Sequence, residues 1–182
     1  MPATEPQTDL NRRGFFKKAL AATLAALAAL VPVGVGLAVA VDPLRHKAAA
    51  GNAVRVTRLD ALPADGLPHR FPVIAAKTDA WNKSDAAPIG AVYLRRTGDD
   101  KIEALNVVCP HAGCSVEFES ASSQFRCPCH RSTFKVDGSL ADPRSPSPRG
   151  MDSLTARVDA DGVVWVTFQN FLAGRPDKVP VA

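Results

Sequence analysis

The longest apolar stretch of the chain, residues 19–41, contains no charged side chain and consists mainly of Ala, Leu and Val. In a helix, which rises 1.5 Å per residue, a stretch of this length exceeds the roughly 30 Å hydrocarbon core of a bilayer. Pro32 and the glycines in this stretch are tolerated in membrane helices. The pattern therefore predicts a single transmembrane helix over residues 19–41.

Basic residues are concentrated just before the predicted span. Residues 11–17 read Asn-Arg-Arg-Gly-Phe-Phe-Lys and resemble a twin-arginine export signal, with Asn where Ser or Thr is usual. Such residues also keep a preceding tail in the cytoplasm. We therefore expect residues 1–18 inside, and the rest of the chain outside, the plasma membrane or bacterial inner membrane. The alternatives are a buried helix or a signal peptide removed at the small residues 38–40, but the length of the apolar run favours an anchor.

After the span, short segments of alternating apolar and polar residues replace the helical pattern. Residues 42–53 form a short Ala- and Gly-rich linker, which we interpret as a hinge, with a passive linker as the alternative. From residue 54 onward, runs of strand-forming residues are separated by turn sequences. These runs are 54–59, 91–95, 102–108, 133–136, 154–158 and 163–168. No strand–helix alternation is present, so the pattern predicts an all-β, antiparallel domain over residues 54–182.

The charge distribution gives no support for binding to nucleic acid. The formal net charge is +4, and the first eighteen residues contribute +2 of it, so the predicted β domain is nearly neutral. Arg131, Arg144 and Arg149 are expected at the surface, either solvated or helping a partner to dock. His46 and His69 are also expected to be solvated, and His69 is expected in a loop that contains several prolines.

All four cysteines and two of the four histidines lie in two short boxes. Residues 109–114 read Cys-Pro-His-Ala-Gly-Cys, and residues 127–132 read Cys-Pro-Cys-His-Arg-Ser. Each box offers one Cys and one His as metal ligands and keeps one Cys spare. Two ligands of each kind are the set that a 2Fe–2S cluster needs when two histidines replace two cysteines on one iron.

We therefore expect Cys109 and Cys127 to bind one iron, and His111 and His130 to bind the other. Imidazole brings less negative charge than thiolate, so a cluster with this ligation is easier to reduce. Its potential lies at roughly −150 to +300 mV, against about −400 mV for all-cysteine plant-type clusters.

The spare cysteines, Cys114 and Cys129, are the natural disulfide partners, and a stable disulfide implies an oxidising compartment. Two other interpretations of the boxes stay open. A Cys₂His₂ zinc site usually pairs Cys with Cys and His with His at each end, whereas this chain mixes them. Two plain disulfides would leave the histidine in each box without a role.

At these residues the chain resembles the Rieske iron–sulfur proteins of cytochrome bc-type complexes. The boxes of that family read Cys-Thr-His-Leu-Gly-Cys and Cys-Pro-Cys-His-Gly-Ser-x-Tyr. The matching positions are Cys109, His111, Gly113, Cys114, Cys127, Pro128, Cys129, His130 and Ser132. Residues 143–148, Pro-Arg-Ser-Pro-Ser-Pro, are similar to the family's Pro-rich loop, which covers the cluster from a third side. The resemblance implies a Rieske-type domain over residues 54–182, with its cluster-binding part at about 105–150.

Several positions are expected to tune the cluster. Ala112 replaces a bulky Leu that often shields the cluster in the family, Arg131 replaces a Gly, and Pro146 lies in the Pro-rich loop. Phe134 replaces a Tyr that donates a hydrogen bond to a ligand sulfur, whereas Ser132 keeps the hydroxyl aimed at a bridging sulfide. Because hydrogen bonds to the sulfurs raise the potential, we expect an intermediate potential, which suits menaquinol better than ubiquinol.

The resemblance also implies an electron-transfer subunit of a membrane quinol:cytochrome c oxidoreductase that is not catalytic alone. His130 is the expected quinol contact, with His111 as a second candidate. The implied partners are a cytochrome b and a cytochrome c-type subunit, since the chain has no Cys-x-x-Cys-His heme motif of its own. The main alternative is the Rieske small subunit of a periplasmic oxidase such as an arsenite oxidase. Ferredoxin and oxygenase Rieske domains lack the spare cysteines and the anchor.

Overall fold

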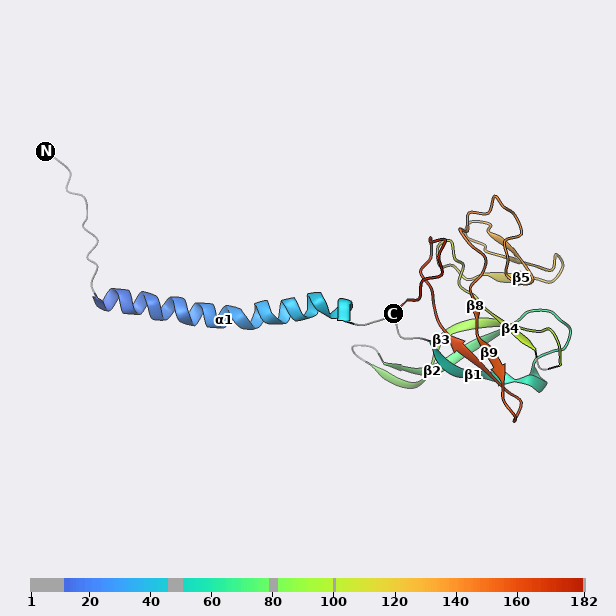
Figure 1. Ribbon diagram of the computed structural model, residues 1–182, viewed down its shortest axis with the longest axis horizontal. Helices are drawn as coiled ribbons and strands as arrows, with labels where there is room; N and C mark the ends of the chain where they lie inside the picture. Colours follow the sequence, from blue (N-terminus) through green and yellow to red (C-terminus); the bar gives the residue numbers. More distant parts are fainter. Residues whose placement is uncertain (1–11, 46–50, 79–81, 100, 182) are drawn as a thin grey trace. The chain divides into compact units, whose positions relative to one another are not determined.

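The computed structural model describes residues 12–45, 51–78, 82–99 and 101–181 (Figure 1). The chain divides into two compact units, Met1–Lys47 and Ala48–Ala182. The first unit contains one helix, and the second contains all the strands. Residues 1–11 of the expected tail and residues 46–50 of the expected hinge, which include His46, lie outside the described residues.

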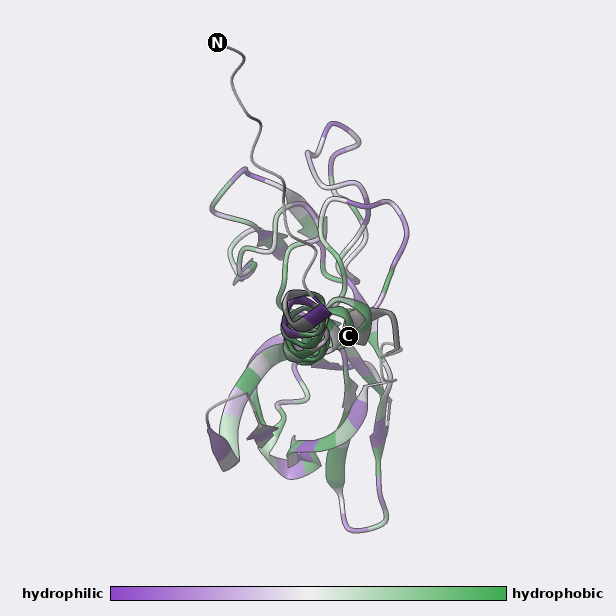
Figure 2. Cartoon of the chain, turned by 90° about the vertical axis from the view of Figure 1, so that its left-hand side faces the viewer, coloured by the Kyte–Doolittle hydropathy of each residue, from purple (hydrophilic) through white to green (hydrophobic). Residues whose placement is uncertain are grey.

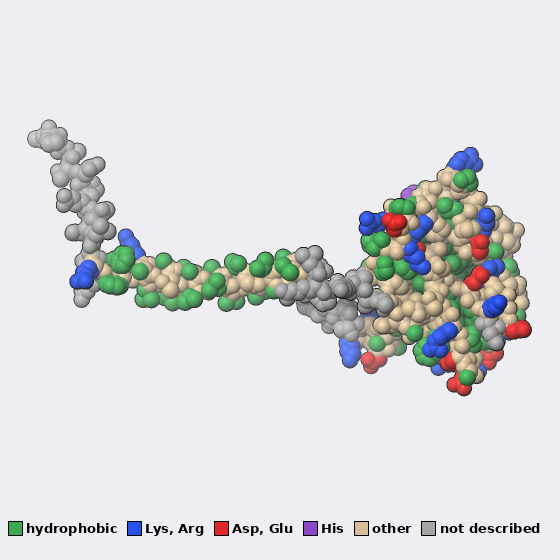
Figure 3. All heavy atoms as spheres, viewed as in Figure 1, with side chains coloured by type: hydrophobic (Ala, Val, Ile, Leu, Met, Phe, Trp, Pro, Cys, Tyr) green, Lys and Arg blue, Asp and Glu red, His purple; other side chains and the backbone are tan. Residues whose placement is uncertain are grey.

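Helix α1 (Arg12–Arg45) contains the predicted transmembrane segment and extends beyond it at both ends. Its portion Gly14–Val41 has a mean hydropathy of 2.5 and is long and apolar enough to cross a membrane. Side chains from residue 15 to residue 40 are exposed on every face of the helix. Figure 2 shows that hydrophobic residues surround the helix axis, and Figure 3 shows no charged side chain along the middle of the helix. A helix whose described side chains are apolar and exposed on all sides is suited to lipid.

The second unit is built from three antiparallel sheets and a short 3-10 helix, η1 (Leu59–Ala61). The first sheet has the order β1 (Asn52–Arg58), β10 (Val163–Phe168), β9 (Ala156–Val158). The second has the order β2 (His69–Thr78), β3 (Lys83–Arg96), β4 (Ile102–Asn106), β8 (Ser153–Leu154). The third has the order β5 (Glu117–Glu119), β6 (Gln124–Arg126), β7 (Thr133–Lys135). This arrangement confirms the predicted all-β, antiparallel domain preceded by one helix.

Two clusters of buried hydrophobic side chains form the core on which these sheets pack. The first lies between the two larger sheets, where Val164, Val166 and Phe168 of β10 point inward at alternate positions. The second lies under the third sheet and includes the fully buried rings of Phe125 and Phe134. Figure 1 shows the third sheet, labelled at β5, in a part of the domain separate from β1, β2 and β3.

Strand β2 was not predicted, and the placement of His69 in a loop was wrong. His69 opens β2, and its ring lies 2.9 Å from a carboxylate oxygen of Asp65. The prolines around this segment indicate a loop, and Pro72 lies inside the strand itself. Because β2 is an edge strand, a missing backbone N–H at Pro72 is tolerated there.

Candidate metal centre

The two Cys–His boxes form two loops at one end of the β domain. Loop 1 (residues 109–114) follows β4, and loop 2 (residues 127–132) connects β6 to β7. In loop 1 the Cys109 N–H donates to the Cys114 carbonyl at 2.7 Å, and the Gly113 N–H donates to the Cys109 carbonyl at 2.9 Å. The loop is thus closed by two backbone hydrogen bonds at its first cysteine.

Loop 2 repeats this turn position by position. The Cys127 N–H donates to the Ser132 carbonyl at 2.8 Å, and the Arg131 N–H donates to the Cys127 carbonyl at 3.0 Å. The fifth residue of each loop has a positive φ, 81° at Gly113 and 59° at Arg131. Glycine adopts this conformation without strain, whereas an arginine with a Cβ does not. The two loops therefore present their first cysteines from equivalent turns, and loop 2 does so under backbone strain.

The loops bring together the four residues predicted as ligands. Cys109 and Cys127 are free thiols, 0% and 1% exposed. The rings of His111 and His130 meet edge to face with centroids 4.7 Å apart. His111 is half-buried, whereas His130 is exposed to solvent. Two sulfurs thus lie inside the domain and two imidazoles lie toward its surface.

The buried Cys109 thiol is in an environment that disfavours its ionised form. Burial raises the pKa of the Cys109 thiol, and the neighbouring Cys127 raises it further. Thiolate is the form that binds metal, and a bound cation deprotonates a coordinating thiol. A bound cation would stabilise the thiolate form of Cys109, which fits the prediction that this residue is a metal ligand.

Two buried polar atoms in the described part of the chain support the same assignment. His111 Nδ1 and Ser132 Oγ are both buried, and neither has a hydrogen-bond partner there. Ser132 Oγ lies near the Cys109 sulfur without forming a hydrogen bond of ordinary geometry. Because unsatisfied buried polar groups are costly, both atoms fit a bound group: a nitrogen free to coordinate iron, and a hydroxyl free to donate to a sulfide.

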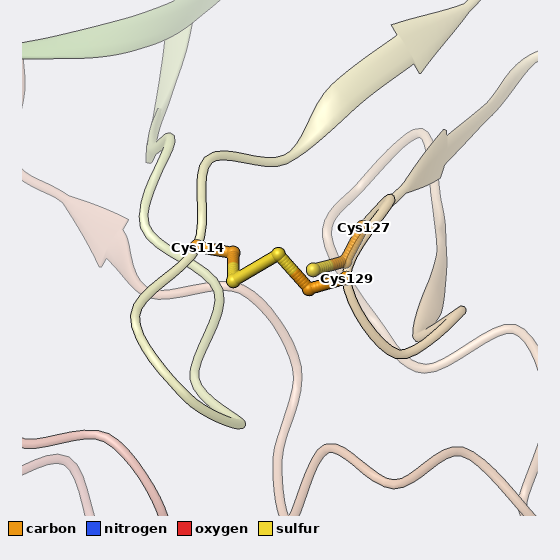
Figure 4. A group of neighbouring side chains, drawn as sticks. All are labelled: Cys114, Cys127 and Cys129. Atoms are coloured by element: carbon orange, nitrogen blue, oxygen red, sulfur yellow. A yellow bond between two sulfur atoms is a disulfide. The ribbon is translucent and has the colours of Figure 1, made fainter.

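Cys114 and Cys129 form a disulfide, the pairing expected from the sequence. The Cys127 sulfur lies beside it, and the three sulfurs are all within 4.8 Å of one another (Figure 4). A disulfide sulfur carries no thiolate, so this trio is not a three-cysteine metal site. Of the three, Cys127 is the residue able to act as a thiolate ligand, and the disulfide joins the two loops next to it.

The predicted tuning residues lie around the loops in different environments. Ser132 and Phe134 are fully buried, and the Phe134 ring belongs to the cluster under the third sheet. Ala112 and Pro146 are exposed. In the Pro-rich loop, the buried Ser147 donates its hydroxyl to the Arg149 carbonyl at 2.7 Å.

The expectation that Arg149 is a surface cation was wrong. Its side chain is 11% exposed and forms an ion pair with Asp152, whose side chain is 6% exposed. The spacing of three residues was visible in the sequence, but nothing there indicated that the pair is buried. Arg144, in contrast, is 89% exposed and lies near Asp142.

Antiparallel sheets carrying two Cys–His loops joined by a disulfide define an iron–sulfur protein with a 2Fe–2S site. The chain belongs to the Rieske family: residues 54–158 match the family model for the Rieske [2Fe-2S] domain. The cofactor of this domain is a Rieske-type 2Fe–2S cluster.

The similar curated proteins are subunits of bc-type complexes. The chain is 31% identical to the cytochrome b6-f complex iron-sulfur subunit 2 of Synechocystis, over 88% of this chain and 86% of that protein. It is 29% identical to the menaquinol:cytochrome c reductase iron-sulfur subunit of Bacillus subtilis, over 87% of this chain and 92% of that protein. The match to the cytochrome b6-f complex iron-sulfur subunit of Synechococcus, at 38% identity, spans 36% of this chain and only 37% of that relative. These relatives make this chain a bc-type Rieske protein with a role in electron transfer.

Proposed function

We propose that this chain is the electron-transfer subunit of a membrane-bound quinol:cytochrome c oxidoreductase. The observation that carries the proposal is the contrast within one site: buried thiols at Cys109 and Cys127, and an exposed imidazole at His130. Relatives over nearly the full chain length are named as iron-sulfur subunits of a menaquinol:cytochrome c reductase and of a cytochrome b6-f complex.

Each of the four ligands has a separate task in this proposal. Cys109 and Cys127 hold one iron, and His111 and His130 hold the other. When bound, the cluster supplies a one-electron acceptor whose potential is raised by its two imidazole ligands. Ser132 supplies a hydroxyl donor from inside the domain, and the disulfide between Cys114 and Cys129 keeps the two loops at a fixed separation.

His130 is the contact for quinol because it is the more exposed of the two imidazoles. Its ring accepts a hydrogen bond from a quinol hydroxyl and takes up the proton, so that proton and electron leave the donor together. His111 is half-buried against the same ring and shares the solvent-facing edge of the site. Both menaquinol and ubiquinol carry the hydroxyl that this contact requires.

Helix α1 serves as an uncleaved anchor in this proposal, with the N-terminus in the cytoplasm and the β domain on the outer side of the membrane. The partners are a cytochrome b, which presents quinol, and a cytochrome c-type subunit, whose heme takes the electron. The linker between the two units acts as a hinge that lets the domain visit both.

The test uses the full-length chain in native membranes, with His130→Ala compared with His69→Ala. His69 lies on β2 and bonds Asp65, outside the two loops, so its loss is the control. We expect His130→Ala to abolish both the Rieske electron paramagnetic resonance signal and quinol oxidation, and His69→Ala to keep both.

Two results would contradict the proposal. One is an unchanged resonance signal in His130→Ala, which would remove this residue from the ligand set. The other is co-purification of the wild-type chain with a molybdopterin enzyme in place of a cytochrome b, which would assign it to a periplasmic oxidase.

A further inference from the structure

After β10 the chain returns to the metal centre. Residues 169–181, here called the C-terminal strap, fold back on themselves through hydrogen bonds that include Leu172 N–H to the Val179 carbonyl at 2.8 Å. At its turn the Gly174 N–H donates to the Pro110 carbonyl of loop 1, also at 2.8 Å. A Cβ added at Gly174 would lie 3.7 Å from the carbonyl oxygen of His111. The strap therefore touches loop 1 at the backbone of Pro110 and His111, of which His111 carries the half-buried imidazole.

Arg149, the residue that follows the Pro-rich loop, forms hydrogen bonds with this strap. Its Nη1 donates to the Arg175 carbonyl, and its Nη2 donates to the Leu172 carbonyl at 3.1 Å. These two carbonyls lie on either side of Gly174 in the sequence. The guanidinium thus holds the strap at both flanks of the residue that bonds loop 1.

Asp152 fixes the other side of the same guanidinium. Its carboxylate accepts from Arg149 Nε at 2.9 Å and from Nη2 at 2.8 Å. The backbone carbonyl of Asp152 in turn accepts from the Asn106 N–H at 2.8 Å, at the end of β4, from which the chain runs into loop 1. Arg149 is therefore tied to loop 1 by two routes, through the strap and through β4.

The geometry needs arginine. A planar guanidinium bonds a carboxylate in bidentate fashion and still has donors for two carbonyls, whereas a lysine ammonium lacks this fork. A buried ion pair is by itself weak evidence for added stability, because desolvation offsets much of the attraction. The four hydrogen bonds of Arg149 are better explained by a role in holding the strap and Asp152 in place.

We propose that Arg149 is a positioning residue for the metal centre, which acts by holding the C-terminal strap against loop 1 and so fixing the place of His111. The proposal rests on the proposed function only in taking His111 as a cluster ligand. Arg149 itself contacts backbone carbonyls and Asp152, and it acts on the site through them.

The experiment compares Arg149→Gln and Arg149→Lys with the matched control Arg144→Gln, all in the full-length, cluster-loaded protein. Arg144 lies in the Pro-rich loop, five residues before Arg149, but it is 89% exposed and bonds only the nearby Asp142 among the described residues. Three quantities are measured: hydrogen exchange of the peptide containing Gly174, the g-values and line width of the Rieske resonance, and the midpoint potential.

In Arg149→Gln we expect the strap to exchange about tenfold faster, the factor that corresponds to losing hydrogen bonds to a charged group. We also expect broadened resonance lines and a shifted potential in the molecules that keep the cluster. Arg149→Lys should give a smaller change in the same direction, and Arg144→Gln should match the wild type in all three measurements.

A variant that lowers the unfolding temperature while leaving the resonance and the potential unchanged would reduce Arg149 to a purely structural role and overturn the proposal. If neither Arg149 variant folds, the wild type still provides a test: exchange around Gly174 at the rate of an unstructured peptide would also overturn it. Failure of the proposed function looks different, because quinol oxidation by the wild type would be missing while the effects of Arg149 on the resonance stayed.

Discussion

Ser132 and Phe134 are two side chains near the metal centre that we expect to tune its potential. Both are fully buried, on either side of the first residue of β7. Ser132 brings a hydroxyl without a partner in the described part of the chain, and Phe134 brings a ring with no donor. We therefore expect Ser132 to donate a hydrogen bond to the cluster and Phe134 to donate none.

We predict that Ser132→Ala lowers the midpoint potential and that Phe134→Tyr raises it. Each change alters one hydrogen bond to a sulfur, and a bond of about 1 kcal/mol corresponds to a shift on the order of 50 mV for a one-electron couple. Protein-film voltammetry of the two variants and the wild type at one pH checks this. The reverse order, or no shift in either variant, would contradict it.

The equivalent turns of loops 1 and 2 give a second residue-scale prediction. Arg131→Gly should stabilise the protein by about 0.5–1 kcal/mol. The substitution removes the strain of an arginine in the left-handed conformation, and this gain exceeds the cost of the greater conformational entropy of glycine in the unfolded state. Gly113→Ala should destabilise it by about 1–2 kcal/mol through φ alone, since no other group lies within 4 Å of the added Cβ.

The measurement is the thermal unfolding midpoint of the cluster-loaded protein, with each variant compared with the wild type. The two substitutions should move the midpoint in opposite directions. Movement in the same direction would mean that the loops differ in more than the residue at their fifth position.

At the scale of elements, the hairpin of β9 and β10 is closed by a single carboxylate. Asp159 accepts from the Trp165 Nε1–H at 2.7 Å, from the Val163 N–H at 2.8 Å and from the Asp161 N–H at 3.1 Å. The hydrogen bond from Trp165, followed by that from Val163, lowers the pKa of Asp159. The turn is therefore tied to the strand by hydrogen bonds that favour the ionised form of Asp159.

We predict that this contribution to stability is present at neutral pH and lost in acid. Because the folded-state pKa lies below the unfolded value, stability is full above the unfolded pKa and falls as the pH drops through the folded pKa. The thermal midpoint of the wild type should exceed that of Asp159→Asn at about pH 6, and the difference should shrink toward about pH 3. A difference that does not change with pH would show that the carboxylate charge has no part in closing the turn.

The sequence predicted some elements well because local pattern and tertiary burial agree in them. The bounds of β10 match the expected run 163–168, since its alternating residues face one hydrophobic cluster. Strand β2 escaped prediction because Pro72 contradicts the strand pattern locally, and only its place at a sheet edge makes the proline acceptable.

For the site, the two boxes predicted which cysteines pair, because ligand spacing is a local property. The buried contacts of Arg149 were not predictable in the same way. Its acceptors include the backbone carbonyls of residues 172 and 175. Every residue has a backbone carbonyl, so the sequence does not indicate which carbonyls accept hydrogen bonds from Arg149.

At the scale of the whole molecule, the chain combines a helix suited to lipid with a β domain that buries its apolar side chains in a core. Side chains on every face of α1 are exposed, whereas the β domain buries its apolar residues in two clusters. The family match covers residues 54–158 and does not reach the helix, whose suitability for a membrane is judged from its length and composition.

The uniform apolar circumference of α1 has a mechanical consequence. A helix with one polar face prefers one orientation about its long axis, because that face seeks water or protein. The middle of α1 has no such face, so contact with lipid is equally favourable at every angle of rotation. In a bilayer, such a helix would have a fixed depth but would be free to rotate about its own long axis.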